Sequence, residues 1–101
     1  MNKAIVWNCR GAGNRAFINA FRLLVNENKS ELLALLETKC HSSKASEVFN
    51  SMGFDNHYCQ PGNGYAGGIW VGWRMGSGNI EVIESHMQFV HLHVVLDHSD
   101  W

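Results

Sequence analysis

The sequence predicts a mixed α/β fold in which two strand–helix units come first and an antiparallel meander of short strands follows. Two observations predict this order. Short apolar runs alternate with amphipathic stretches over residues 1–53, and strand-like stretches separated by glycine-rich turns occupy the rest of the chain. The chain has 101 residues, of which 46% are hydrophobic, so it forms one domain at most, with a modest core.

The first strand–helix unit occupies residues 4–25. Ala4–Trp7 is a short apolar run that predicts a buried strand ending at Asn8. Asn14 is suited to cap a helix, because its side chain accepts hydrogen bonds from free backbone N–H groups. The helix predicted after it has one apolar face, made of Phe17, Ala20, Phe21, Leu24 and Val25.

The second unit and the meander follow the same logic. Leu32–Leu36 predicts a second buried strand, because the run is short, apolar and follows a helix. A second amphipathic helix is expected to end at Gly53, with an apolar face of Ala45, Val48, Phe49 and Met52. Beyond Phe54 we expect a loop at 60–66, strands at 68–73, 80–83 and 89–96, and a hairpin-type turn at 76–79.

Charge and hydropathy exclude several classes of protein. Charged residues make up 17% and the net charge is −1, which excludes a disordered tail and a strongly basic nucleic-acid arm. Residues 1–50 carry a net +3 and residues 51–101 a net −4, and +3 alone does not establish nucleic-acid binding. No apolar run approaches the ~18 residues of a membrane helix, and no signal-peptide core is present. We therefore expect an intracellular protein of the nucleus or cytoplasm, not secreted and without a membrane partner.

Polar residues follow both predicted strands of the first half. Asn8 ends the first strand and Glu37 directly follows the second. Open α/β sheets bind ligands at the carboxyl ends of their strands, and one carboxylate together with a substrate phosphate is enough to hold Mg²⁺. Lys39 can pair with that carboxylate or with a phosphate. The alternative is a turn-forming asparagine and two solvated loop residues.

Two other motifs compete with this interpretation. Gly11–Ala16 fits the dinucleotide pattern G-x-G-x-x-A, with Glu37 as the ribose-binding acid, but three polar residues separate the strand from the first glycine, and antiparallel strands follow. His91 and His93 share one face of a strand and have a zinc-binding spacing, but without a fixed third ligand we expect half-buried strand histidines. The cysteines Cys9, Cys40 and Cys59 form no C-x-x-C pair, so we expect buried, reduced thiols.

Four sequence blocks match a known pattern in order and spacing along nearly the whole chain. They are Trp7-Asn8-Cys9-Arg10-Gly11-x-Gly13, Leu-Leu-x-Leu-Leu-Glu37-Thr38-Lys39, Gly53-Phe54 and Gly67-Gly68-Ile69-Trp70-Val71. Together they resemble the endonuclease domain of plant LINE-type (non-LTR) retrotransposons, which belongs to the endonuclease/exonuclease/phosphatase superfamily.

The resemblance implies a four-layer α/β sandwich that hydrolyses phosphodiesters with a divalent metal, Mg²⁺ or Mn²⁺, and that nicks target DNA. It implies that Asn8 helps to set the metal and phosphate environment and that Glu37 binds the metal. Lys39, Gly67 and Gly68 match further family positions, and we expect them to support the phosphate site. These roles agree with the chemistry, because hydrolysis of a phosphodiester anion needs a cation and an activated water.

The sequence departs from the family pattern in two ways. Ala66 replaces the serine of a Ser-Gly-Gly block, so a hydroxyl is lost. The family's second-half tyrosine, Gly-Asp-x-Asn block and Ser-Asp-His block have no counterpart, and the similar letters of Asp97–Trp101 lie in the wrong order and place. We expect residues 1–101 to be the truncated N-terminal half of such a domain, inactive as an isolated chain. An exposed sheet face that favours self-association is also expected. The alternative is a non-enzymatic module that binds metal or DNA.

Overall fold

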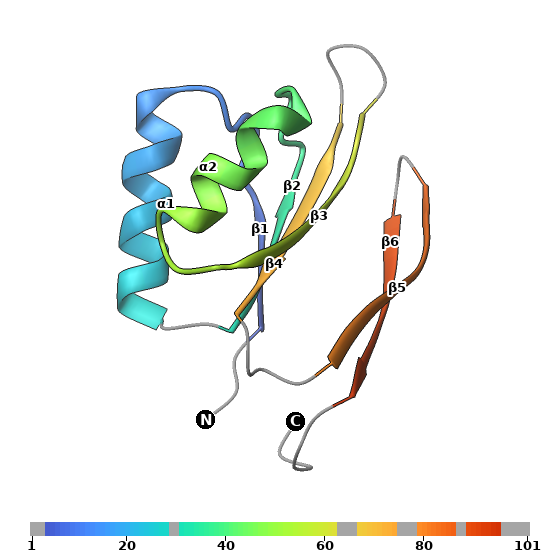
Figure 1. Ribbon diagram of the computed structural model, residues 1–101. Helices are drawn as coiled ribbons and strands as arrows, with labels where there is room; N and C mark the ends of the chain where they lie inside the picture. The colour runs from blue at the N-terminus through green and yellow to red at the C-terminus, as the bar shows by residue number, and fades with distance from the viewer. Residues whose placement is uncertain (1–3, 29–30, 63–66, 75–78, 87–88, 96–101) are drawn as a thin grey trace.

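The computed structural model describes residues 4–28, 31–62, 67–74, 79–86 and 89–95. Within these residues lie β1 (Ala4–Asn8), α1 (Arg15–Asn28), β2 (Leu32–Leu36), a 3-10 helix η1 (Ser42–Lys44), α2 (Ala45–Asn50), β3 (Asn56–Gln60), β4 (Ile69–Trp73), β5 (Asn79–His86) and β6 (Phe89–Val95). The helices cover one side of a four-stranded sheet, and the β5–β6 hairpin lies on its other side (Figure 1). The predicted mixed α/β class is confirmed.

The first strand–helix unit forms where the sequence predicts it, but the expectation of a buried first strand is wrong. Residues of β1 alternate between exposed and half-buried, because β1 is the edge strand of the sheet. β1 and β2 run parallel, with Asn8 paired in register to Leu36, and α1 connects them. The backbone N–H of Phe17 donates to Asn14 Oδ1 at 2.8 Å, so Asn14 caps the helix. The buried face of α1 is Phe17, Phe21 and Val25, one residue per turn. Ala20, predicted on this face, is exposed, because the buried stripe is narrower than the apolar pattern.

The four-stranded sheet has the order β1-β2-β4-β3, and β4 runs antiparallel to both of its neighbours. Strand β3 is absent from the predicted elements because its sequence, Asn56–Gln60, is mostly polar. Strand β4 supplies the apolar surface instead. Ile69, Trp70 and Val71 are all buried, since helices cover one face of this strand and the hairpin approaches the other.

The predicted continuous meander is wrong. Strands β2 and β3 occupy both edges of β4, so β4 has no free edge with which β5 can pair. Strand β5 instead pairs with β6 in a separate two-stranded sheet. The register of this pair shifts between Val82 and Glu84, and the pairing continues to His86. The turn expected at 76–79 falls largely on 75–78, outside the described residues.

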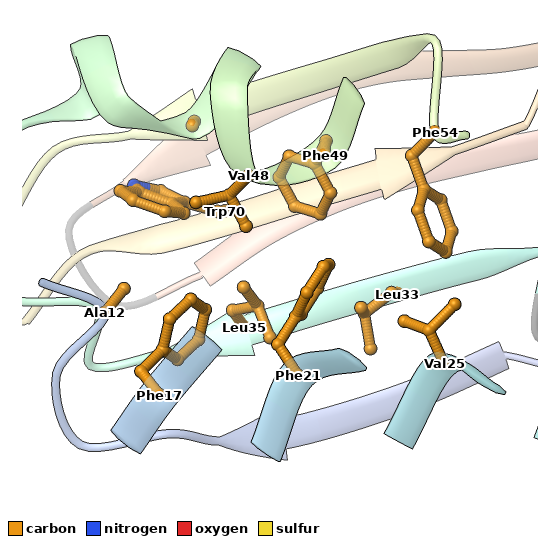
Figure 2. Packing of buried hydrophobic residues seen from close by; sticks show 11 residues of the cluster. Ala12, Phe17, Phe21, Val25, Leu33, Leu35, Val48, Phe49, Phe54 and Trp70 are labelled. Atoms are coloured by element: carbon orange, nitrogen blue, oxygen red, sulfur yellow. The ribbon is translucent and has the colours of Figure 1, made fainter. Parts of the chain in front are cut away.

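The core lies between the helices and the four-stranded sheet (Figure 2). Phe49 of α2 stands at its centre, with ring centroids 6.2 Å from Phe21, 5.9 Å from Phe54 and 6.5 Å from Trp70, all in edge-to-face geometry. Each of these side chains is at most 1% exposed. Burial of a large apolar side chain stabilises a fold by about 1.5–3 kcal/mol, so this cluster is the main source of stability.

A polar contact joins the hairpin to the sheet. Tyr58 Oη and Ser85 Oγ lie 2.7 Å apart, and Val71, the register partner of Tyr58, is 2% exposed on the same face.

Other apolar side chains stay exposed, namely Val6, Leu23, Ile83, Phe89 and Val94. The exposure of these single residues does not test self-association through a sheet face, which stays a prediction. Among the described residues, every helix is too short or too polar to cross a bilayer.

Candidate functional site

The parallel pairing of β1 and β2 brings two predicted site residues together. Both strands end at the same edge of the sheet, which places Asn8 beside the residue that follows Leu36. There the side-chain amide of Asn8 donates through Nδ2 to Glu37 Oε2 at 2.5 Å. The acceptor is a carboxylate, so this hydrogen bond is charge-assisted.

Lys39 reaches the same carboxylate from the other side. Its Nζ lies 3.9 Å from Glu37 Oε1, and the two side chains are 44% and 43% exposed. An exposed ion pair at this distance contributes only a few tenths of a kcal/mol to folding. The ammonium and the carboxylate are therefore held near each other but stay open to a ligand from solvent.

The backbone after β2 has an uncommon shape. Glu37 and Lys39 have φ angles of 53° and 48°, in the left-handed region that non-glycine residues seldom adopt. Three hydrogen bonds on Thr38 and Lys39 hold this shape. Thr38 N–H donates to Gly68 O at 3.2 Å, Lys39 N–H donates to Gly67 O at 2.9 Å, and Thr38 O accepts from Ala12 N–H at 2.7 Å. The β1–α1 loop and the segment before β4 thus clamp the loop that carries Glu37.

Gly67 and Gly68, the other two predicted site residues, contact this loop through their backbone. Their φ angles are 79° and 97°, which favour glycine. A Cβ at Gly68 would overlap Thr38 Oγ1, so the close approach of the two segments also needs glycine there. In this structure both glycines support the site by fixing the loop. Ala66, the position of the lost hydroxyl, lies outside the described residues.

Sequence reasoning missed Thr38. Its side chain is fully buried, and its Oγ1 has no hydrogen-bond partner among the described residues. The sequence does contain a pattern that indicates its burial: a small β-branched residue lies between two charged residues directly after a strand. The flanking residues turn outward to solvent while Thr38 turns inward.

The three cysteines are free thiols, but they are half-buried, so the prediction of buried thiols is wrong. All three pack against the hydrophobic core cluster and stay partly accessible to solvent. Cys9 follows Asn8 and donates through Sγ to Leu36 O at 3.3 Å. Burial raises the pKa of the Cys9 thiol, and the nearby charge of Glu37 adds to this, so the thiol stays protonated beside the site.

The histidine pair lies away from the site, on the hairpin. His91 and His93 are exposed on β6, so the expectation of half-buried side chains is wrong. His93 Nδ1 lies 3.9 Å from Glu81 Oε2, its cross-strand partner. Within the described part of the chain, no group of three His, Cys, Asp or Glu side chains is arranged to hold a metal ion.

The sheet order also weighs against the dinucleotide alternative. That fold continues with parallel strands, whereas the second neighbour of β2 is the antiparallel β4.

The site therefore offers one carboxylate, one amide and one ammonium group at a solvent-open sheet edge. Comparison with models of protein families and with curated proteins gives no match.

Proposed function

We propose that this chain carries the metal- and phosphate-binding corner of a Mg²⁺- or Mn²⁺-dependent phosphodiesterase related to the LINE-type retrotransposon endonucleases. One observation carries the proposal, namely the contact between Asn8 and Glu37 at the ends of adjacent parallel strands, with Lys39 beside them. The layer order supports the same relationship, since a four-layer sandwich needs helices on one face of the first sheet and a second sheet on its other face.

The donor set suits a hard divalent cation. Glu37 supplies carboxylate oxygens, and the amide of Asn8, which donates through Nδ2, keeps its Oδ1 for a cation. The open position of Glu37 suits Mg²⁺, which retains several waters when a protein binds it. A bound metal would offset phosphate charge and lower the pKa of a water. Lys39, whose Nζ lies 3.9 Å from Glu37 Oε1, would contact a phosphate oxygen of the substrate.

We expect binding without appreciable turnover. In the described part of the chain, Glu37 pairs with Asn8 and Lys39 but with no histidine that would act as a general base. Loss of a general base lowers a rate by about 10²–10⁴-fold. This favours the second candidate function, a non-enzymatic module that binds metal and the DNA backbone through the net +3 half of the chain. Salt-dependent DNA binding supports that module, and its absence at low salt contradicts it.

A Mn²⁺ titration tests the metal site. Glu37→Gln removes the carboxylate charge and is expected to weaken Mn²⁺ binding by at least about tenfold. The matched control is Glu27→Gln, the same change at an exposed position near the end of α1. Free Mn²⁺ is measured by electron paramagnetic resonance. Equal affinities in the wild type and both variants would contradict the proposed site.

A nicking assay on supercoiled plasmid tests the activity. With Mg²⁺ or Mn²⁺ present, we expect the rate of nicking to stay at background in the wild type and in Glu37→Ala. Nicking that depends on Glu37 would overturn the expected inactivity while it supports the family relationship.

A further inference from the structure

Thr38 differs from both of its neighbours in its surroundings. Glu37 and Lys39 have half-exposed side chains, whereas Thr38 is fully buried between the β1–α1 loop and the segment before β4. Its backbone takes part in two of the three hydrogen bonds that hold the loop. Thr38 is therefore the point at which this loop is attached to the rest of the fold.

The loop needs such an attachment because its shape is costly. A non-glycine residue in the left-handed region costs about 1 kcal/mol or more, and Glu37 and Lys39 both adopt it. This pair of turns aims both side chains at one place, where the carboxylate meets Asn8 and the ammonium. If the loop relaxed to ordinary φ angles, the direction of Glu37 would change and the contact with Asn8 would be lost.

We propose that Thr38 is a positioning residue, whose buried side chain holds Glu37 in the geometry that contacts Asn8 and receives a divalent cation. The part of this inference that concerns the cation rests on the proposed function, whereas the part that concerns the Asn8–Glu37 contact does not.

The shape of the Thr38 side chain carries this role. The described residues offer its Oγ1 no partner, while Gly68 approaches so closely that even a methyl group there would overlap Oγ1. Valine has nearly the shape of threonine without the hydroxyl, so Thr38→Val keeps the contact with Gly68. Alanine leaves the space beside Gly68 empty and frees the loop.

The test uses the full chain in four forms, namely wild type, Thr38→Ala, Thr38→Val and Val25→Ala. Val25 is 3% exposed at the other end of the core from Ala12, so its truncation lowers stability without touching the site (Figure 2). The first readout is the NMR resonances of the Asn8 side-chain amide without metal. The second is the affinity for Mn²⁺.

We expect Thr38→Ala to shift the Asn8 amide resonances toward those of a free asparagine and to weaken Mn²⁺ binding about tenfold. Thr38→Val and Val25→Ala should keep both values. The proposal is overturned if Thr38→Ala leaves the Asn8 resonances where Val25→Ala leaves them. If Thr38→Val matches Thr38→Ala, the hydroxyl carries the role and the assignment to shape is wrong.

Two outcomes separate this inference from the function on which it rests. A wild type that binds no Mn²⁺ removes the proposed function, while the Asn8 resonances still decide the role of Thr38. If Thr38→Ala does not fold, Thr38→Ser removes only the γ-methyl group. Because serine keeps Oγ1 beside Gly68, the Asn8 resonances should stay near those of the wild type, and a shift toward those of a free asparagine would overturn the proposal that this contact holds the loop.

Discussion

The four-stranded sheet with its helices and the β5–β6 hairpin are built in different ways. In the first region, buried apolar side chains from two helices and two strands, β2 and β4, meet in one closed cluster. In the hairpin, Ile83 is 48% exposed and Phe89 is 46% exposed. A two-stranded hairpin alone is marginally stable in water, so β5 and β6 depend on their contact with the sheet. Stability is therefore concentrated in the region that also positions Asn8 and Glu37.

The largest test of this difference compares two phenylalanines. Phe49→Ala empties the centre of the core and should lower the free energy of unfolding by about 3–5 kcal/mol. Phe89→Ala removes the same atoms from an exposed site, where the ring stacks on His86, and should cost less than about 1 kcal/mol. Urea unfolding followed by circular dichroism measures both. Similar losses in the two variants would contradict the uneven distribution of stability.

The sequence predicts those parts of the fold that local pattern determines. Ala4–Trp7 and Leu32–Leu36 are apolar enough to be recognised as strands, and Asn14 is placed to cap a helix. Asn56–Gln60 has no such pattern. It becomes strand β3 because β4 offers it a free edge, and its partners on β4 lie 9 to 17 positions further along the chain. The same pairing removes β5 from the sheet, which no local signal reports.

The candidate site divides in the same way. Asn8 and Glu37 follow predicted strands, so their meeting needs only that the two strands be parallel neighbours. The direction of Lys39 and the burial of Thr38 depend on left-handed turns at non-glycine residues, which intrinsic propensity opposes. These turns exist because Gly67, Gly68 and Ala12 supply hydrogen bonds from other parts of the chain. Such contacts appear only in three dimensions.

The contact between the two regions gives an intermediate effect. Tyr58→Phe removes the hydroxyl that lies 2.7 Å from Ser85 Oγ and should cost about 1 kcal/mol. Because this bond joins β3 to β5, Tyr58→Phe should increase the rate of amide hydrogen exchange more in β5 and β6 than in β1 and β2, relative to the wild type. Ser85→Ala removes the same bond from the other side. The double variant should therefore cost less than the sum of the two single changes, and strict additivity would show that the hydroxyl pair does not couple.

The smallest expected effect is the response of the helix-covered region to alkaline pH. Cys59 of β3 packs against the core cluster, and burial raises the pKa of its thiol from 9.0 to about 11. The folded state therefore prefers the protonated thiol more strongly than the unfolded state does. The stability that this preference contributes is fully present below about pH 9 and is lost as the pH rises through about 11.

Cys59→Ala isolates this contribution from the other groups that titrate at high pH. Urea unfolding at pH 8 and pH 10.5 should show a smaller loss of stability in the variant than in the wild type, although the variant is less stable at pH 8. Because the described residues of the hairpin include no cysteine, the difference should arise in the core region, and amide exchange in β3 should report it before exchange in β6. An equal loss in both proteins would mean that the Cys59 thiol ionises as easily in the folded chain as in the unfolded one, and that β3 is less closely covered than its contacts indicate.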